Sequence, residues 1–177
     1  MDQTEGAIRF MNASSEIILI ADPRILAVPV QENNEPLIDL KETGCISFGP
    51  PPERPESLHF YTKIRKTVFE KLLNAQKLLP KGIRFELYEG FRSLALQKVL
   101  FEMNYQKVKE TGKFSSHEEI FMETTKLVSP VQSLSGEVNV PPHSTGGAFD
   151  VSLIDDNGKK LEWACQLTNG PMLLFKS

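Results

Sequence analysis

The sequence predicts an α+β fold in which helices pack on a small antiparallel sheet. Between Lys63 and Leu79, apolar residues recur at three- and four-residue spacing, which predicts an amphipathic helix that ends at Pro80. The stretch IRFELYE at 83–89 alternates apolar and polar residues, as a half-buried strand does. Two strand-like runs, AFDVSLI and KKLEWACQL, flank an Asn157-Gly158 pair, and that arrangement predicts a β-hairpin.

Extended segments are predicted before this pattern. Residues 16–30 are rich in aliphatic side chains and contain Pro23 and Pro29, which favours one or two short strands over a long helix. The segment EPLIDL at 35–40 is expected to be another extended piece. GPPPERP at 49–55 has four prolines in seven residues, and we expect it to form an exposed connector.

Two further helices are expected in the middle of the chain. The first runs from about Leu94 to Lys109. The second begins near Ser116, because Ser116 and Glu119 have the Ser-x-x-Glu form of a capping box. The apolar residues expected on the inner side of the first helix are Ala95, Val99, Leu100, Met103 and Val108.

The composition is that of one ordinary globular domain. The chain has 177 residues, of which 40% are apolar and 24% charged, and this length suffices for a well-buried core. The net charge is −3, and lysines and arginines are scattered among acids. A chain of this kind has no basic surface for a phosphate backbone, so nucleic acid is not an expected partner.

The sequence also predicts a cytoplasmic protein. MDQTEGAIRF lacks the cationic and apolar regions of a signal peptide, and the most apolar run, 16–30, is interrupted by Asp22, Pro23 and Arg24. We therefore expect neither a signal peptide nor a membrane partner. Two cysteines, Cys45 and Cys165, are too few for a disulfide framework and fit a reducing compartment.

The first candidate site is the stretch PPHSTGGAFDVSL at 141–153, in which His143 and Asp150 are separated by a glycine pair. A neutral imidazole and a carboxylate are ligand types that zinc takes in hydrolytic sites. Gly146 and Gly147 allow the backbone to fold back, so that a loop histidine and a strand aspartate can face the same point. The spacing alone also fits a simple hydrogen-bonded pair.

The second candidate site is YEGFRSLALQ at 88–97, which places Arg92 at the junction between the predicted strand and the following helix. An arginine there can direct its fork of N–H groups at a carboxylate or at a developing oxyanion. The alternative is a surface arginine near a helix N-terminus.

Together and in this order, Gly-Phe-Arg-Ser…Gln and His-Ser-Thr-Gly-Gly-Ala-Phe-Asp resemble the D-alanyl-D-alanine dipeptidases. These are zinc enzymes of a wider group that includes D,D-carboxypeptidases, lysostaphin-type peptidases and Hedgehog domains. The resemblance runs from about EPLIDL to the hairpin and implies a Hedgehog/D,D-peptidase-like fold with Zn²⁺ as cofactor. It implies that His143 and Asp150 bind the zinc, through His-x-x-Gly-x-Ala-x-Asp, and that Ser144 binds substrate. Arg92 would stabilise the tetrahedral intermediate that forms when zinc-bound water attacks the peptide carbonyl.

The chain departs from the family pattern in two places. Pro141 stands where the family commonly has a serine, which changes the loop but removes no ligand. The family's later Glu-x-x-His element, which supplies the general base and the third zinc ligand, is absent. The other histidines, His59 and His117, lie outside the family's motifs. We therefore expect residues 1–177 to form a single dipeptidase-like domain that is incomplete at its C-terminus.

A thiolate is one candidate for the missing ligand. If Asn157-Gly158 form a two-residue turn, Asp156 pairs with Lys159, and the same register places Cys165 across from Asp150. That register places Glu162 across from Leu153 on the opposite side of the sheet, where it is badly placed to act as the base. The alternative is that Cys165 is a small buried hydrophobe.

Three functions remain open from the sequence. The first is hydrolysis of the free D-alanyl-D-alanine dipeptide in peptidoglycan metabolism, a small substrate that fits a cytoplasmic enzyme. The second is a catalytically inactive remnant or binding module of the same fold. The third is a D,D-carboxypeptidase that acts on longer cell-wall peptides. The sequence does not determine the oligomeric state.

Overall fold

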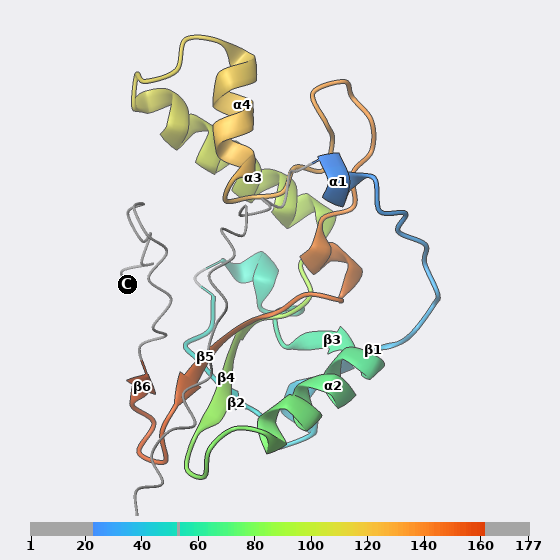
Figure 1. Cartoon of the computed structure of the whole chain (residues 1–177), viewed down its shortest axis with the longest axis vertical. Coiled ribbons are helices and arrows are strands. Elements are labelled where there is room, and N and C mark those ends of the chain that lie inside the picture. Colours follow the sequence, from blue (N-terminus) through green and yellow to red (C-terminus); the bar gives the residue numbers. More distant parts are fainter. Residues whose placement is uncertain (1–22, 53, 162–177) are drawn as a thin grey trace, which may run out of the picture.

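The strand β4 (Arg84–Glu89) is central to the sheet, in a computed structural model that describes residues 23–52 and 54–161. β5 (Asp150–Ile154) pairs antiparallel with one edge of β4, and β2 (Ser47–Phe48) pairs parallel with the other. Helices and a mixed, largely antiparallel sheet confirm the predicted α+β class (Figure 1).

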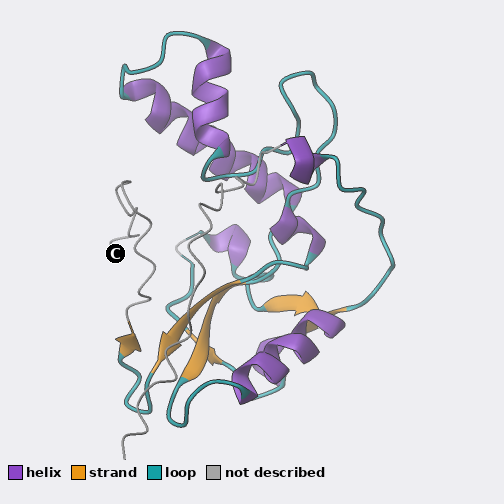
Figure 2. Cartoon of the chain, viewed as in Figure 1, coloured by secondary structure: helices purple, strands orange, loops and turns teal. Residues whose placement is uncertain are grey.

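The other elements complete this arrangement. β6 (Lys160–Leu161) pairs antiparallel with β5, and β1 (Leu37–Asp39) with β3 (Lys63–Arg65) forms a second, two-stranded sheet. Figure 2 shows how much of the described chain is loop between these elements. The helices are α1 (Pro23–Leu26), α2 (Lys66–Lys77), α3 (Leu94–Glu110) and α4 (His117–Thr125), with 3-10 turns η1 (Leu40–Glu42), η2 (Pro55–Ser57) and η3 (Pro142–Thr145).

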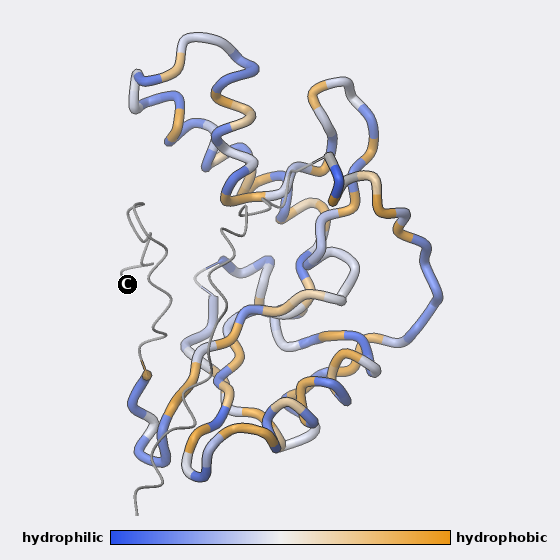
Figure 3. Tube along the Cα trace, in the orientation of Figure 1, coloured by the Kyte–Doolittle hydropathy of each residue, from blue (hydrophilic) through white to orange (hydrophobic). Residues whose placement is uncertain are grey.

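The core lies between α2 and the face of the sheet that carries the apolar residues of β4. Leu72 of α2 and Leu87 of β4 are buried in it, and Phe85 packs against it. This confirms the predicted alternation over 83–89, because the apolar residues of that strand face the helix. Figure 3 shows hydrophobic residues on both β4 and the facing α2. The buried cluster consists of Leu40, Ile46, Ile64, Leu72 and Leu87.

The helix predicted from Lys63 begins three residues later than expected. Residues 63–65 form β3, in which Ile64 lies opposite Ile38 of β1 and is fully buried. Arg65 keeps an extended backbone as the N-cap of α2. The apolar spacing of Ile64 fits the helix pattern by position, but its tertiary pairing with Ile38 decides its conformation.

The helix from Leu94 to Glu110 is present, but its inner face differs from the prediction. Ala95, Val99 and Met103 are exposed, whereas Leu96 and Gln97 are buried. The prediction is wrong for these three exposed residues, whereas Leu100 and Val108 are partly buried. The capping box of α4 is confirmed: the Ser116 hydroxyl accepts from Glu119 N, and the Glu119 carboxylate accepts from Ser116 N.

The strands predicted for 16–30 are not found in the described part of that segment. Pro23–Leu26 form the short helix α1, and 29–34 have no regular structure. Residues 1–22 lie outside the described residues. The extended piece predicted at 35–40 is confirmed over Leu37–Asp39, and residues 50–52 of the connector have no regular structure.

The β-hairpin is present, but its register differs by one residue from the prediction. Ile154 lies opposite Lys160, whereas a two-residue turn would place Asp156 opposite Lys159. The turn is one residue longer because Asp156 joins Asn157 and Gly158 in the loop, while Asp155 donates its N–H to the Lys159 carbonyl and accepts from the Gly158 N–H. Gly158 has a φ of 78°, which suits a three-residue loop.

The predicted positions of Glu162 and Cys165 assumed a two-residue turn, and the structure has a three-residue turn instead. Leu161 faces Leu153, where Glu162 was expected. Glu162 and Cys165 themselves lie outside the described residues. Within the described part of the chain, no helix has the length and apolar character needed to cross a bilayer.

We predict that Leu87→Ala destabilises the fold strongly. The side chain is fully buried at the centre of the core, and removing a buried leucine costs about 2–5 kcal/mol of unfolding free energy. Leu78→Ala is the matched control, because Leu78 is 87% exposed at the end of α2. Urea unfolding of both variants checks this, and equal effects of the two substitutions would contradict the described core.

Candidate metal centre and arginine site

The loop that carries His143 is shaped by its sequence. Pro141 and Pro142 favour the backbone that enters η3, and Gly146 ends the turn with a φ of 73°. The Gly146 N–H donates to the His143 carbonyl at 3.2 Å. His143 is thus the second residue of a short, hydrogen-bonded turn.

The imidazole of His143 is oriented by the end of β4. Its Nδ1 lies 2.8 Å from the carbonyl oxygen of Gly90. An Nδ1–H that donates to this carbonyl leaves the lone pair of the neutral ring on Nε2, which is the arrangement seen in histidine ligands of metals. The His143 side chain is only 18% exposed.

The backbone of Gly90, whose carbonyl accepts this bond, lies unusually close to β3. A Cβ on Gly90 would lie 2.4 Å from the carbonyl oxygen of Lys63. The Gly90 N–H donates to Tyr61, and the Phe91 N–H donates to Lys63. A glycine is therefore required at this point of the strand.

A β-bulge brings Asp150 to the same place. In the pairing of β4 with β5, Leu87 lies opposite Val151 and Glu89 opposite Asp150, so Tyr88 is the extra residue. Bulges of this kind redirect side chains at strand ends. The Asp150 Oδ2 lies 3.5 Å from the His143 Nε2, and the Asp150 side chain is 59% exposed.

The geometry of this pair fits two positions of a zinc site. Zinc binds imidazole nitrogen and carboxylate oxygen at about 2.0–2.2 Å, and tetrahedral angles then separate two ligand atoms by roughly 3.4 Å. The His143 Nε2 and Asp150 Oδ2 are 3.5 Å apart. The Gly90 carbonyl also contacts the other ring nitrogen of His143, as a partner that orients a histidine ligand does.

The described residues supply two candidate ligands and not three. Among residues 23–52 and 54–161, no group of three or more His, Cys, Asp or Glu side chains could hold a metal ion. His117 instead bonds Tyr105 through Nδ1, and His59 lies against Phe60. The candidate third ligand, Cys165, lies outside the described residues.

Arg92 lies between β4 and α3, next to the His143 turn. Its backbone N–H donates to the His143 carbonyl at 3.2 Å. Its guanidinium donates from Nε to Glu89 at 2.9 Å and from Nη2 to the second oxygen of that carboxylate. Nη1 donates to Gln97 at 2.8 Å, and the Arg92 side chain is 13% exposed.

This network holds the guanidinium in place and leaves donors free. An arginine has five N–H groups, and two of those on Arg92 are not used by Glu89 or Gln97. Gln97 is 2% exposed, and its Nε2 donates to the Ser129 carbonyl at 2.6 Å. Arg92 is therefore positioned by a buried amide on one side and a carboxylate on the other.

Sequence reasoning identified Arg92 but missed Glu89 and Gln97 as its partners. Both residues lie in the YEGFRSLALQ stretch, so their proximity in the chain was the available signal. Which side chains meet depends on the turn between β4 and α3, and the sequence does not specify that turn.

Ser144 has a side chain that is not satisfied by the described residues. Its Oγ is buried and has no hydrogen-bond partner among them. A buried hydroxyl without a partner costs about 1–3 kcal/mol relative to one that is bonded. A water molecule or a ligand atom beside Ser144 would remove this cost.

The pKa of His143 is raised above its ordinary value. Burial alone lowers this pKa, but the hydrogen bonds to Asp150 and Gly90 and the charge of Asp150 outweigh it. Burial likewise raises the pKa of Asp150, but the hydrogen bond and charge of His143, with the charge of Arg92, hold it below its usual range. Without metal, each side chain therefore stabilises the charged form of the other.

We predict that Asp150→Asn lowers the pKa of His143 in the metal-free protein. The substitution removes the charge that stabilises the imidazolium and keeps a similar side-chain shape. NMR titration of the imidazole C–H signals measures this pKa. Asp156→Asn is the matched control, because this carboxylate is 78% exposed in the hairpin and bonds Arg84 instead. An unchanged His143 titration in Asp150→Asn would contradict the described pair.

Comparison with known proteins points to peptidases. No protein-family model matches the chain. Over 151 residues it is 22% identical to a D-alanyl-D-alanine dipeptidase from Synechocystis sp., covering 77% of this chain and 60% of that protein's length. A solved structure of the LdcB LD-carboxypeptidase is 19% identical, covers 71% of this chain and 46% of the other, and has a TM-score of 0.37. The similarity in sequence is thus to a peptidase, and at 22% identity it does not identify the individual enzyme.

Proposed function

We propose that this chain is a cytoplasmic zinc peptidase that hydrolyses the D-alanyl-D-alanine dipeptide of peptidoglycan metabolism. The observation that carries the proposal is the convergence of His143, Asp150 and Arg92 at one end of the β4–β5 pair. The same residues carry the dipeptidase-like motifs of the sequence. The similarity in sequence to a D-alanyl-D-alanine dipeptidase also supports it.

The roles of the residues follow from their contacts. His143 and Asp150 would hold zinc through Nε2 and Oδ2, with Gly90 orienting the histidine. Bound there, zinc would supply Lewis-acid activation of water and of the scissile carbonyl. Arg92 would direct its two free N–H groups at the oxyanion that develops on that carbonyl. Ser144 would bind a polar atom of the substrate through its buried hydroxyl.

A second candidate function is a binding module without catalysis. Glu89 is the carboxylate nearest to Arg92 along the chain, and it accepts two hydrogen bonds from that guanidinium. Both oxygens of this carboxylate are engaged by Arg92, and the loss of a general base costs about 10²–10⁴ in rate. The chain spans about 60% of the length of the curated relative that it matches.

The deciding experiment is an assay of D-alanine release. The full 177-residue chain with stoichiometric zinc is incubated with D-alanyl-D-alanine, and the Asp150→Ala protein serves as the blank. Release above the blank supports the peptidase. No release from folded protein that still binds the dipeptide would favour the binding module. A longer peptide ending in D-Ala-D-Ala, used in parallel, tests the carboxypeptidase alternative.

We predict that the ligand and arginine variants separate zinc binding from turnover. His143→Ala and Asp150→Ala should lose zinc, because each removes one of the two described ligands. Arg92→Lys should keep zinc but lower kcat by about 10²–10³, the usual cost of losing an oxyanion donor. Arg84→Lys is the matched control, since Arg84 lies at the start of β4 and bonds Ser47 and Asp156 instead. Zinc retained by His143→Ala, measured by chelator competition, would refute the ligand assignment.

We further propose Cys165 as the third ligand, because it is the thiol nearest to this strand pair along the chain. If this is right, Cys165→Ser weakens zinc binding by at least tenfold, since a serine hydroxyl is a poorer zinc ligand than a thiolate. Cys45→Ser is the matched control, because Cys45 is exposed and contacts Thr43. Equal zinc affinity of the two variants would contradict Cys165 as a zinc ligand. It would favour the alternative that Cys165 is a small hydrophobic residue.

A further inference from the structure

Arg65, at the end of β3, contacts the loop that carries His143. Its backbone N–H donates to the Gly146 carbonyl at 3.0 Å, and its side-chain Nε donates to the Thr145 carbonyl at 2.8 Å. These are the carbonyls at the end of η3, where a cation is electrostatically favoured. The Arg65 side chain is 16% exposed.

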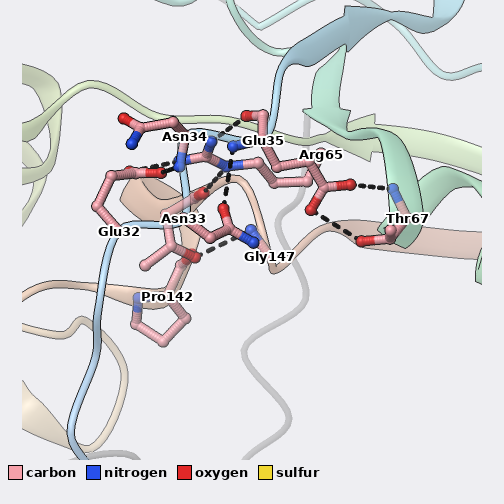
Figure 4. Close-up of polar contacts among 9 residues, drawn as sticks. Glu32, Asn33, Asn34, Glu35, Arg65, Thr67, Pro142 and Gly147 are labelled. Carbon is pink, nitrogen blue, oxygen red and sulfur yellow. Dashed lines mark hydrogen bonds and ion pairs between the residues drawn. The ribbon is translucent and has the colours of Figure 1, made fainter.

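The other side of the same guanidinium binds the segment before β1. Nη1 donates to the carbonyl of Glu35, and Nη2 forms an ion pair with the Glu32 carboxylate at 2.7 Å. The Glu35 carboxylate accepts from the N–H and the hydroxyl of Thr67 at the start of α2. Figure 4 shows Arg65 between this segment and the loop that contains Pro142 and Gly147.

The loop has little freedom to move away from Arg65. A Cβ on Gly146 would lie 2.5 Å from a methyl carbon of Leu37 and 3.2 Å from the Arg65 Cγ, so the loop backbone packs directly on β1 and β3. The Thr145 hydroxyl donates to the Pro142 carbonyl, which closes the turn from inside. The planar fork of Arg65 joins the Thr145 end of this turn to the segment before β1.

The geometry points to Arg65 as a positioning residue for His143. It fixes the carbonyl end of η3, and η3 places the imidazole against Gly90 and Asp150. None of the contacts described above joins Arg65 to the imidazole or to Asp150. Arg65 therefore acts on His143 through the η3 turn. Its effect on zinc rests on the proposed function, but its effect on the turn does not.

The first test is hydrogen exchange in the metal-free full-length protein. Gly146 and Arg92 both donate their N–H groups to the His143 carbonyl, so their amides report on the turn. Arg65→Met keeps the length of the side chain and removes the fork. We expect the two amides to exchange at least tenfold faster in this variant, while the amides that pair β4 with β5 are unchanged. Equal acceleration of all amides, or no change, would overturn the assignment, because either would mean that Arg65 does not act on the turn in particular.

The second test is zinc affinity, measured with zinc alone by chelator competition. Loss of an outer-shell contact typically weakens metal binding 10–100-fold, and we expect about tenfold for Arg65→Met. Arg65→Lys should not restore affinity, because one ammonium group cannot reproduce the two directed bonds to Thr145 and Glu35. Arg84→Met is the control for loss of an arginine elsewhere. Unchanged zinc affinity in Arg65→Met would overturn the effect of Arg65 on the metal ligand.

The two proposals fail in different ways. If the wild-type chain binds no zinc, the proposed function is wrong, and the exchange of Gly146 and Arg92 still decides the role of Arg65. If wild type binds zinc but the Arg65→Met amides do not change selectively, the positioning role is wrong and the zinc site stands.

Discussion

The site depends on the close approach between Gly90 and the backbone of β3. A side chain at Gly90 would collide with the Lys63 carbonyl, and the approach is held by the N–H groups of Gly90 and Phe91. The carbonyl of the same glycine receives the imidazole of His143, and Arg92 follows two residues later. The backbone at Gly90 therefore joins the two sheets and orients a candidate metal ligand. It also begins the segment between β4 and α3 that contains Arg92.

The pair formed by His143 and Asp150 also explains how the site can fold without metal. A charged imidazole as little exposed as that of His143 would be costly alone, but the Asp150 carboxylate lies 3.5 Å from its Nε2. Zinc would have to displace the proton that the raised pKa of His143 retains, so metal and proton compete for Nε2. In this respect the centre differs from small zinc domains, in which the ligands are unpaired until the metal binds.

Local patterns in the sequence were sufficient for the strand at 83–89 and for the capping box at Ser116, because each depends on neighbouring residues. They were insufficient where a contact between residues far apart in the sequence determines the local conformation. Ile64 is a strand residue paired with Ile38, and α3 buries Gln97, a polar residue that the apolar pattern did not place inside. The candidate ligands were found from their motif, whereas Arg65 is separated from Thr145 by 80 positions and no local pattern connects them.

The bulge at Tyr88 constrains how this chain could vary in length over evolution. Side chains of a strand alternate between faces, so the loss of one residue from β4 would exchange the sides of every residue beyond it. Because Tyr88 is an extra residue, Leu87 faces the core while Glu89 lies opposite Asp150. Insertions and deletions should accordingly be rare in β4 and common in exposed segments such as 133–138, where a gained or lost residue changes only a surface loop.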